Sequence, residues 1–135
     1  VRTLIARHPP GLTQRAAACF LAAGHYNAHA RRMRARMERR HAVLRDAIEA
    51  EGFADALASR FSGAFLWFEG PSALDADVLR ETLRAKSVLI EPGSSFYAAQ
   101  DSPNNTIRIG FSAIPVARIP EGIALLCQGI RDQIG

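Results

Sequence analysis

Residues 106–112 read Thr-Ile-Arg-Ile-Gly-Phe-Ser, and apolar and polar residues alternate strictly along them. Successive side chains of a β-strand point to opposite faces of its sheet, so this pattern predicts a strand. Ile107, Ile109 and Phe111 would face a core. The other face would carry Arg108 among small residues, where a ligand could approach.

Two further strands are predicted upstream. Residues 64–68 form the continuous apolar run Ala-Phe-Leu-Trp-Phe, whose aromatic content favours a strand. Its continuity indicates that both faces of this strand are covered. Residues 87–90, Ser-Val-Leu-Ile, form the other strand, which ends at Glu-Pro-Gly over 91–93. We therefore expect a small sheet of about three strands, mostly antiparallel or mixed.

Helices are predicted before, between and after these strands. Thr13 can cap a first helix that Gly24 ends, and a second helix is expected over 25–51. Asp75 can cap a short helix, and a last helix should start near Pro120. The apolar positions of the second helix form a single stripe at helical spacing: Tyr26, Ala30, Met33, Met37, Leu44 and Ile48.

The order α, long α, β, α, β, β, α predicts a two-layer α/β (α+β) fold, with helices packed on one face of the sheet. A chain of 135 residues suits a single domain with its own core. We divide it into a lead-in with the first helix (1–24), a long linking helix (25–51) and a small α/β subdomain (62–135). The linking helix would be about 40 Å long. Such a helix exceeds the needs of this globule, so we expect it to join two domains of a longer protein.

Composition and charge argue against several classes of protein. No apolar run approaches the roughly 20 residues that span a bilayer, and no signal segment opens the chain, so we expect a cytoplasmic protein. Residues 31–45 hold seven arginines and one acid, while the rest of the chain is slightly acidic. This clustering weakens a case for general nucleic-acid affinity. The arginines could form a solvated helix face, an interdomain or dimer contact, or phosphate contacts.

The cysteines and histidines give no metal or redox motif. Cys19 and Cys127 lie far apart in apolar helical patterns, so we expect buried small hydrophobes in a reducing compartment. His25 and His29 are four residues apart and would share a helix face. No carboxylate or cysteine nearby completes a ligand set, and we expect no bound metal.

Three motifs in this order and spacing carry a family resemblance. They are Gln14 to Arg34, with Gly24-His25-Tyr26 leading into His29-Ala30-Arg31-Arg32-Met33-Arg34; Glu91-Pro92-Gly93-Ser94-Ser95-Phe96; and Ile107 to Ser112, followed by Pro120-Glu121-Gly122-Ile123. Together they cover nearly the whole chain. They resemble the carboxy-terminal small domain of a fold type I, pyridoxal-phosphate-dependent aminotransferase of class I/II, and most of all the MocR branch of the GntR-type transcriptional regulators.

The resemblance implies a carboxylate site at Arg108, for an amino acid or a 2-oxo acid. A guanidinium offers the planar, two-pronged donor set that matches a carboxylate. Ser94, Ser95 and Phe96 would line the same site. Without the resemblance, the strand favours an arginine that is paired with a nearby acid or lies in solvent, and the resemblance reverses that preference.

The resemblance also implies that the cofactor chemistry lies elsewhere. The large domain, the Schiff-base lysine and the main phosphate-binding groups would precede residue 1. Lys86 is the only lysine here and ends a predicted helix, whereas a Schiff-base lysine needs a desolvated pocket. We therefore expect this chain alone to bind no pyridoxal phosphate and to catalyse no transamination.

Two functions of the parent protein stay open. One is a MocR-type regulator that senses an amino acid or pyridoxal phosphate and contacts DNA only through an amino-terminal winged helix-turn-helix domain. The other is an aminotransferase that moves an amino group between an amino acid and a 2-oxo acid. For either we expect a homodimer, packing between this chain and the large domain, and no membrane contact. A free-standing interaction domain is a third, weaker interpretation.

Overall fold

The computed structural model describes residues 10–57, 63–98 and 103–135, and the backbone divides into two compact units, Val1–Arg36 and Met37–Gly135. The first unit contains helix α2 (Gly11–Ala22) and the beginning of helix α3 (His25–Ala50). Gly24 separates these helices with a φ of +72°, which confirms the predicted stop. The predicted cap at Thr13 is wrong, because Pro10 holds the N-cap position and its carbonyl accepts a hydrogen bond from the Gln14 N–H.

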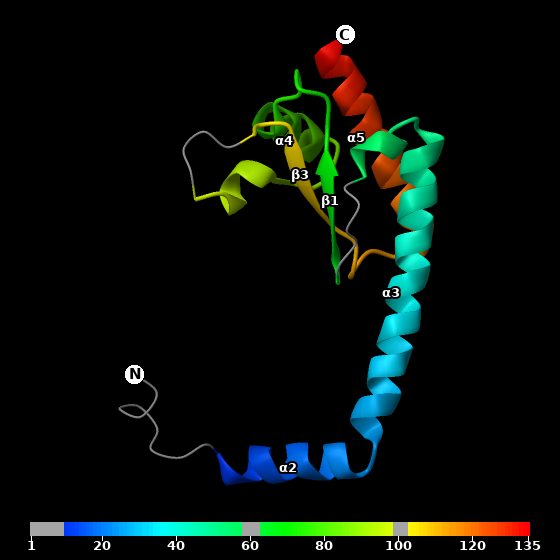
Figure 1. The fold of residues 1–135 in the computed structure, drawn as a ribbon, viewed down its shortest axis with the longest axis vertical. Coiled ribbons are helices and arrows are strands. Elements are labelled where there is room, and N and C mark those ends of the chain that lie inside the picture. The colour runs from blue at the N-terminus through cyan, green and yellow to red at the C-terminus, as the bar shows by residue number, and fades with distance from the viewer. Residues whose placement is uncertain (1–9, 58–62, 99–102) are drawn as a thin grey trace. The chain divides into compact units, whose positions relative to one another are not determined.

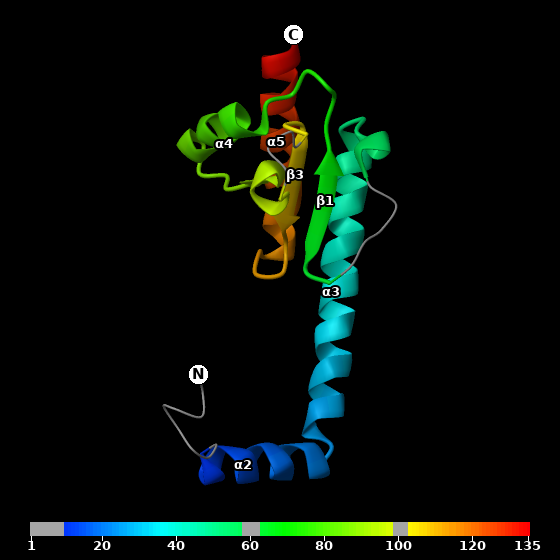
Figure 2. The same cartoon turned by 60° about the vertical axis from the view of Figure 1, so that its left-hand side comes forward.

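The second unit is built around a three-stranded antiparallel sheet (Figure 1). Strand β3 (Thr106–Gly110) lies in the centre, between β1 (Phe65–Glu69) and β2 (Glu91–Pro92). Figure 2 shows β1 and β3 side by side from a second direction. The prediction of a small, mostly antiparallel sheet is confirmed.

Helices cover one face of this sheet. The later turns of α3 join α4 (Ala76–Ala85) and α5 (Ile119–Ile134) in a single core, as the predicted fold requires. The largest fully buried side chains are Phe68, Phe111, Leu44, Ile48, Leu66, Leu79, Leu83, Ile107, Leu126, Ile130 and Cys127. Beside this core, Arg131 of α5 donates to the Glu51 carboxylate at 2.7 Å, which links the ends of α5 and α3.

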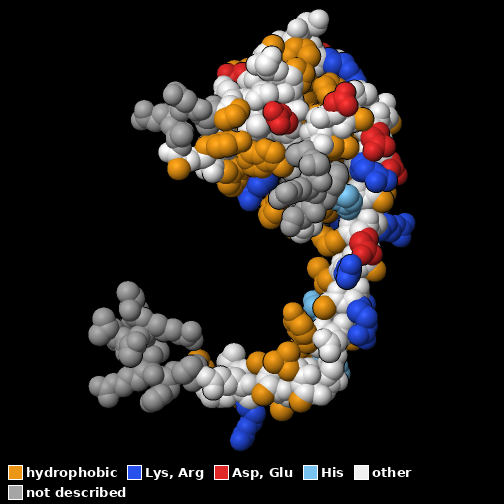
Figure 3. Space-filling model, in the orientation of Figure 1, with side chains coloured by type: hydrophobic (Ala, Val, Ile, Leu, Met, Phe, Trp, Pro, Cys, Tyr) orange, Lys and Arg blue, Asp and Glu red, His pale blue; other side chains and the backbone are white. Residues whose placement is uncertain are grey.

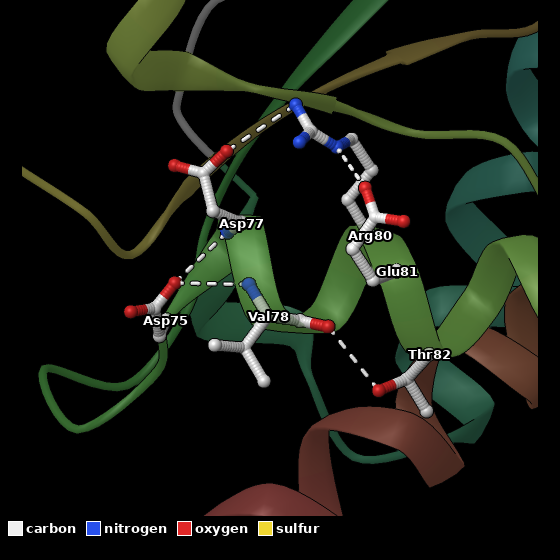
Figure 4. A network of polar contacts seen from close by, with 6 residues as sticks. All are labelled: Asp75, Asp77, Val78, Arg80, Glu81 and Thr82. Atoms are coloured by element: carbon white, nitrogen blue, oxygen red, sulfur yellow. Dashed lines mark hydrogen bonds and ion pairs between the residues drawn. The ribbon is translucent and has the colours of Figure 1, made fainter.

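Helix α4 begins where the sequence predicts. The Asp75 carboxylate accepts hydrogen bonds from the Asp77 and Val78 N–H groups, both at 3.0 Å (Figure 4). These bonds satisfy two backbone donors that a helix start leaves open. Arg80 then pairs with Asp77 one turn along. The helix directs Leu79 and Leu83 into the core.

The predicted strand over 87–90 is wrong. Ser87 has a φ of +59°, and its N–H donates to the Arg84 carbonyl. The Val88 N–H donates to the Leu83 carbonyl. These two bonds make a Schellman motif, which ends helix α4. The strand starts only at Glu91, so the apolar residues that suggested a strand belong to the helix end and the turn after it.

The face of the sheet away from these helices is only partly covered. Burial alternates along β1: Leu66 and Phe68 are buried, whereas Phe65 is exposed and Trp67 is half-buried. Rings from residues 96–97 pack edge-on against Trp67. Figure 3 shows hydrophobic side chains at the surface of this unit. The continuous apolar run of 64–68 therefore combines a core face with a second, partly exposed aromatic face.

Candidate functional site

Strand pairing places Arg108 in the middle of the partly exposed sheet face. Arg108 lies directly opposite Trp67 of β1 and opposite Glu91 of β2. Directly opposed residues of antiparallel strands project to the same face. The position of Arg108 is thus set by the register of three strands, and its side chain is 28% exposed.

Two aromatic rings contact the guanidinium of Arg108. The carbon Cζ lies 4.2 Å from the ring centroid of Phe65 and 4.2 Å from that of Phe96. A cation at this distance is attracted by the negative potential of a ring face. The two rings come from β1 and from the 3₁₀ turn η2 (Gly93–Phe96). They limit both the hydration and the orientation of the guanidinium.

Glu91 occupies one edge of the guanidinium. The Arg108 Nε–H donates to Glu91 Oε2 at 2.5 Å. This hydrogen bond, with the positive charge behind it, lowers the pKa of Glu91 against a smaller opposing effect of burial. The same hydrogen bond raises the pKa of Arg108. Both groups are therefore charged at neutral pH, and Arg108 does pair with a nearby acid, as one interpretation of the sequence allowed.

The other edge of the guanidinium is available. Within residues 10–57, 63–98 and 103–135, neither Nη1 nor Nη2 of Arg108 makes a hydrogen bond. Arg108 lines an open depression at the surface, together with Phe65, Leu89, Ile90, Glu91 and Gly110. Apart from the ion pair, this depression is apolar. An Nη1–Nη2 edge beside an apolar wall can bind a carboxylate with two parallel hydrogen bonds.

The turn η2 brings one of its three predicted site residues to Arg108. Gly93 packs so closely on β3 that an added Cβ would lie 2.0 Å from Thr106 Oγ1. This approach holds the turn against the strand and places Phe96 over the guanidinium. Ser94 is half-buried and Ser95 is exposed, and neither of these described hydroxyls is hydrogen-bonded to Arg108, whose side chain donates to Glu91.

Sequence reasoning missed Glu91 and Phe65. The sequence predicts Glu91 only as the end of a strand and Phe65 only as one residue of a covered apolar run. The sequence places Glu91 between the apolar residues Ile90 and Pro92. That pattern is typical of a strand with one exposed face, so it could have indicated the face of Glu91, although not its pairing with Arg108.

The remaining candidate groups do not form a second site. Lys86 is exposed at the C-cap of helix α4, which does not fit a Schiff-base lysine. Cys127 is buried, and burial, with a smaller contribution from the Glu51 charge, raises its pKa to about 12. Cys19 is exposed, so the expectation that it is buried is wrong. No group of three or more metal-ligating side chains occurs among the described residues.

Two arginines of the cluster, Arg40 and Arg45, make local contacts. Arg40 donates from Nε to the Ile114 carbonyl at 3.0 Å. Arg45 pairs with Asp46 at 3.6 Å and with Glu49 at 3.5 Å. Part of the arginine cluster therefore makes contacts within this chain. Over its described residues the chain has no helix long and apolar enough to cross a membrane.

Known proteins share this sequence and this architecture. The family described as aminotransferase class I and II matches residues 1–126. The HTH-type transcriptional regulator TauR of Rhodobacter capsulatus is 41% identical over 131 residues, which are 97% of this chain and 27% of the regulator. Aromatic-amino-acid aminotransferase 1 of Thermococcus litoralis is 35% identical over 72 residues, 53% of this chain and 17% of the enzyme. The chain thus spans about a quarter or less of these relatives.

Solved aminotransferases have the same fold. LysN, the α-aminoadipate aminotransferase of Thermus thermophilus, superposes with a TM-score of 0.79 at 23% identity, over 98% of this chain and 34% of that one. The kynurenine aminotransferase of Pyrococcus horikoshii gives a TM-score of 0.73 at 24% identity, over 86% of this chain and 29% of that one. These likenesses extend the sequence match to the three-dimensional arrangement of the elements.

Proposed function

Because this chain belongs to the aminotransferase class I and II family, we propose that it supplies the carboxylate clamp for an amino acid or 2-oxo acid. The clamp is Arg108. The proposal rests on the contacts of the Arg108 guanidinium. Its faces contact the rings of Phe65 and Phe96, and its Nε–H donates to Glu91. Its Nη1 and Nη2 atoms make no hydrogen bond to the described residues.

This arrangement favours binding for a physical reason. An arginine side chain loses rotational freedom when it binds a ligand, and that loss opposes affinity. Arg108 loses less, because the rings and Glu91 already restrict it. The partly enclosed position also weakens competition from water. A ligand carboxylate therefore meets an oriented, two-pronged donor.

We assign the cofactor, pyridoxal phosphate, to a longer parent protein. The described part of this chain does not fit the cofactor's covalent anchor, because its only lysine, Lys86, is exposed at a helix end. When bound, pyridoxal phosphate supplies an electron sink for chemistry at an amino acid. The contribution of this chain is to bind and orient the acid end of the ligand through Arg108.

We propose that the parent is a cytoplasmic MocR/GntR-type regulator that senses an amino acid or pyridoxal phosphate. The support is the 41% identity with a transcriptional regulator over 97% of the chain. In such a parent, DNA contact belongs to a winged helix-turn-helix domain, and the protein is a homodimer. The second candidate is an aminotransferase, which the match to an aromatic-amino-acid aminotransferase favours over half of the chain. The parent sequence before Val1 separates the two.

Replacing Arg108 by alanine tests the clamp. In the full-length, cofactor-loaded protein, Arg108→Ala should weaken amino-acid binding roughly 10–150-fold, the usual contribution of a charged two-pronged contact. Cofactor affinity should stay unchanged. Calorimetric titration of the loaded protein with the amino acid that gives the largest response in a panel measures the first affinity, and titration of the cofactor-free protein with pyridoxal phosphate measures the second.

Two further variants sharpen this test. Arg108→Lys keeps the charge but loses the planar fork, so it should recover only part of the affinity. Arg80→Ala is the matched control, because Arg80 is also an ion-paired arginine, but on helix α4. Amino-acid affinity equal to wild type in Arg108→Ala would remove Arg108 from the site.

A further inference from the structure

Glu91 lies directly opposite Arg108 across the β2–β3 ladder and binds the Nε edge of its guanidinium. We propose that Glu91 determines the charge specificity of the site: it restricts the clamp to ligands that carry a single carboxylate at that end. This inference rests on the proposed role of Arg108. Its ligand class is an amino acid whose side chain carries no carboxylate, or the corresponding 2-oxo acid.

The geometry of the guanidinium leaves room for one further carboxylate. A guanidinium presents two edges on which a carboxylate can form paired hydrogen bonds, one made of Nε and the nearer Nη, and one made of Nη1 and Nη2. Glu91 fills the Nε edge, with its Oε2 2.5 Å from the nitrogen. Only the Nη1–Nη2 edge remains for a ligand. A second carboxylate of the same ligand finds no free edge on Arg108.

The charges around the depression also favour this restriction. Its described lining is completed by Phe65, Leu89, Ile90 and Gly110, so Glu91 and Arg108 are the only charged residues among the described ones that line it. The charge of Glu91 balances that of Arg108, and a ligand that brings two negative charges meets a nearly neutral pair and an apolar wall. Two like charges a few ångströms apart in water repel enough to change affinity roughly fivefold, and more where water is partly excluded.

The backbone of Glu91 is held in place. The residues on either side of it, Ile90 and Pro92, are buried. Its backbone is paired with Arg108 in the sheet. A ligand could displace the carboxylate only by breaking the ion pair, and the Glu91 side chain, which is half exposed, would still remain within reach of Arg108.

L-glutamine and L-glutamate are matched probes, because they have nearly the same shape and differ by one charge. Calorimetric titration of the full-length, cofactor-loaded protein should give tighter binding of L-glutamine. Glu91→Gln keeps an oxygen that accepts from Nε but removes the charge. It should raise the affinity for L-glutamate relative to L-glutamine by at least about fivefold.

Two further variants distinguish charge from anchoring. Glu91→Ala removes the acceptor as well as the charge, so Arg108 loses its orientation and L-glutamine should bind more weakly than in Glu91→Gln. Glu81→Gln is the matched control: Glu81 is also an exposed acid paired with an arginine, Arg80, but on helix α4. It should leave the ratio of the two affinities at its wild-type value. Circular dichroism of each variant verifies that it is folded.

The outcomes separate this inference from the proposed function. If Arg108→Ala abolishes binding of both probes but Glu91→Gln leaves their affinity ratio unchanged, the specificity role of Glu91 is wrong and the clamp stands. An equal gain for both probes in Glu91→Gln also overturns it, because the charge would then act without selectivity. If Arg108→Ala changes neither affinity, both proposals fail. If the wild-type protein binds neither probe, the specificity inference fails, and the clamp is tested separately with the amino acid that gives the largest response in the panel.

Discussion

At the scale of single residues, the Arg108–Glu91 pair has a pH dependence with a definite sign. The hydrogen bond from Arg108 lowers the pKa of Glu91 below its ordinary value of 4.5. The folded chain thus keeps this carboxylate ionised more firmly than the unfolded chain does. The pair contributes its full stability above about pH 4.5 and loses it as the pH falls through the lowered pKa.

Urea unfolding of wild type and Glu91→Gln measures this dependence. The amide accepts the same hydrogen bond without titrating, so the variant should be less stable than wild type at neutral pH. The two free energies of unfolding should converge in acid. A difference that stays constant from neutral to acidic pH would show that the charge of Glu91 contributes nothing to folding.

The backbone conformation of Ser87 should also have a measurable effect on the stability of the fold. It adopts a left-handed φ of +59° at the end of α4, where glycine is the usual residue. Ser87→Gly should stabilise the fold by roughly 0.5 kcal/mol. Relief of about 1–2 kcal/mol of backbone strain outweighs the 0.5–1 kcal/mol or so of extra chain entropy that glycine loses on folding. The urea midpoint at constant slope measures the change.

Gly52 allows the reverse substitution, from glycine to a residue with a Cβ, as a control. It ends helix α3 with a φ of +81°, and the Gly52 and Phe53 N–H groups donate back to the Glu49 and Ile48 carbonyls. Gly52→Ala should therefore destabilise the fold by about 1 kcal/mol. Destabilisation by Ser87→Gly would mean that the serine makes a contribution beyond its backbone conformation.

The sequence predicts on which face of the sheet Arg108 lies, but it does not predict the acid with which Arg108 pairs. Strict alternation over 106–112 fixes which side of a strand each residue takes, and the core side is confirmed by the burial of Ile107, Ile109 and Phe111. The partner Glu91 comes from a strand of only two residues. Two residues carry no periodicity, so no pattern in the sequence could align Glu91 with Arg108.

At the scale of elements, long periodic segments were predicted well. The helix expected over 25–51 is His25–Ala50, and the last helix starts at Ile119. The strand expected over 87–90 failed, because a helix end formed by backbone hydrogen bonds has the same apolar residues as a short strand. Local backbone hydrogen bonds decide whether such a segment forms a helix end or a strand. The apolar content of the segment does not indicate which hydrogen bonds form.

The turn η2 depends on one glycine for its position. A Cβ at Gly93 would lie 2.0 Å from Thr106 Oγ1 and 2.7 Å from Thr106 Cβ. Thr106 belongs to the central strand and is 2% exposed, so it cannot move aside cheaply. Gly93→Ala should cost about 1–3 kcal/mol, as overpacking does. It should also displace Phe96 from Arg108 and weaken ligand binding.

Gly122 is the matched control for Gly93. It lies inside helix α5, and no atom comes within 4 Å of an added Cβ. Gly122→Ala should be neutral or stabilising by up to about 1 kcal/mol, because alanine favours helix more than glycine. Urea unfolding of both variants makes the comparison. If Gly93→Ala unfolds like wild type, the turn is not fixed by this contact.

At the scale of the whole molecule, the stability resides in one unit. Every member of the core cluster lies between Leu44 and Ile130, and no described residue before Met37 is buried. Helix α2 has no buried residue, and an isolated helix of its length is marginal in water. The order of elements and the family motifs predicted the architecture of the unit Met37–Gly135. Burial shows that this unit alone has the core that stabilises it.

A chain shortened to residues 37–135 should therefore unfold cooperatively, with a free energy of unfolding within about 1 kcal/mol of that of the full chain, since residues away from a packed core contribute little. Its urea slope should be nearly unchanged, because the same apolar surface is exposed. Leu44→Ala is the control: it should cost about 2–5 kcal/mol in both lengths of chain, because Leu44 is 1% exposed and its removal leaves a cavity. A shortened chain that loses its cooperative transition would show that residues 1–36 belong to the folding unit.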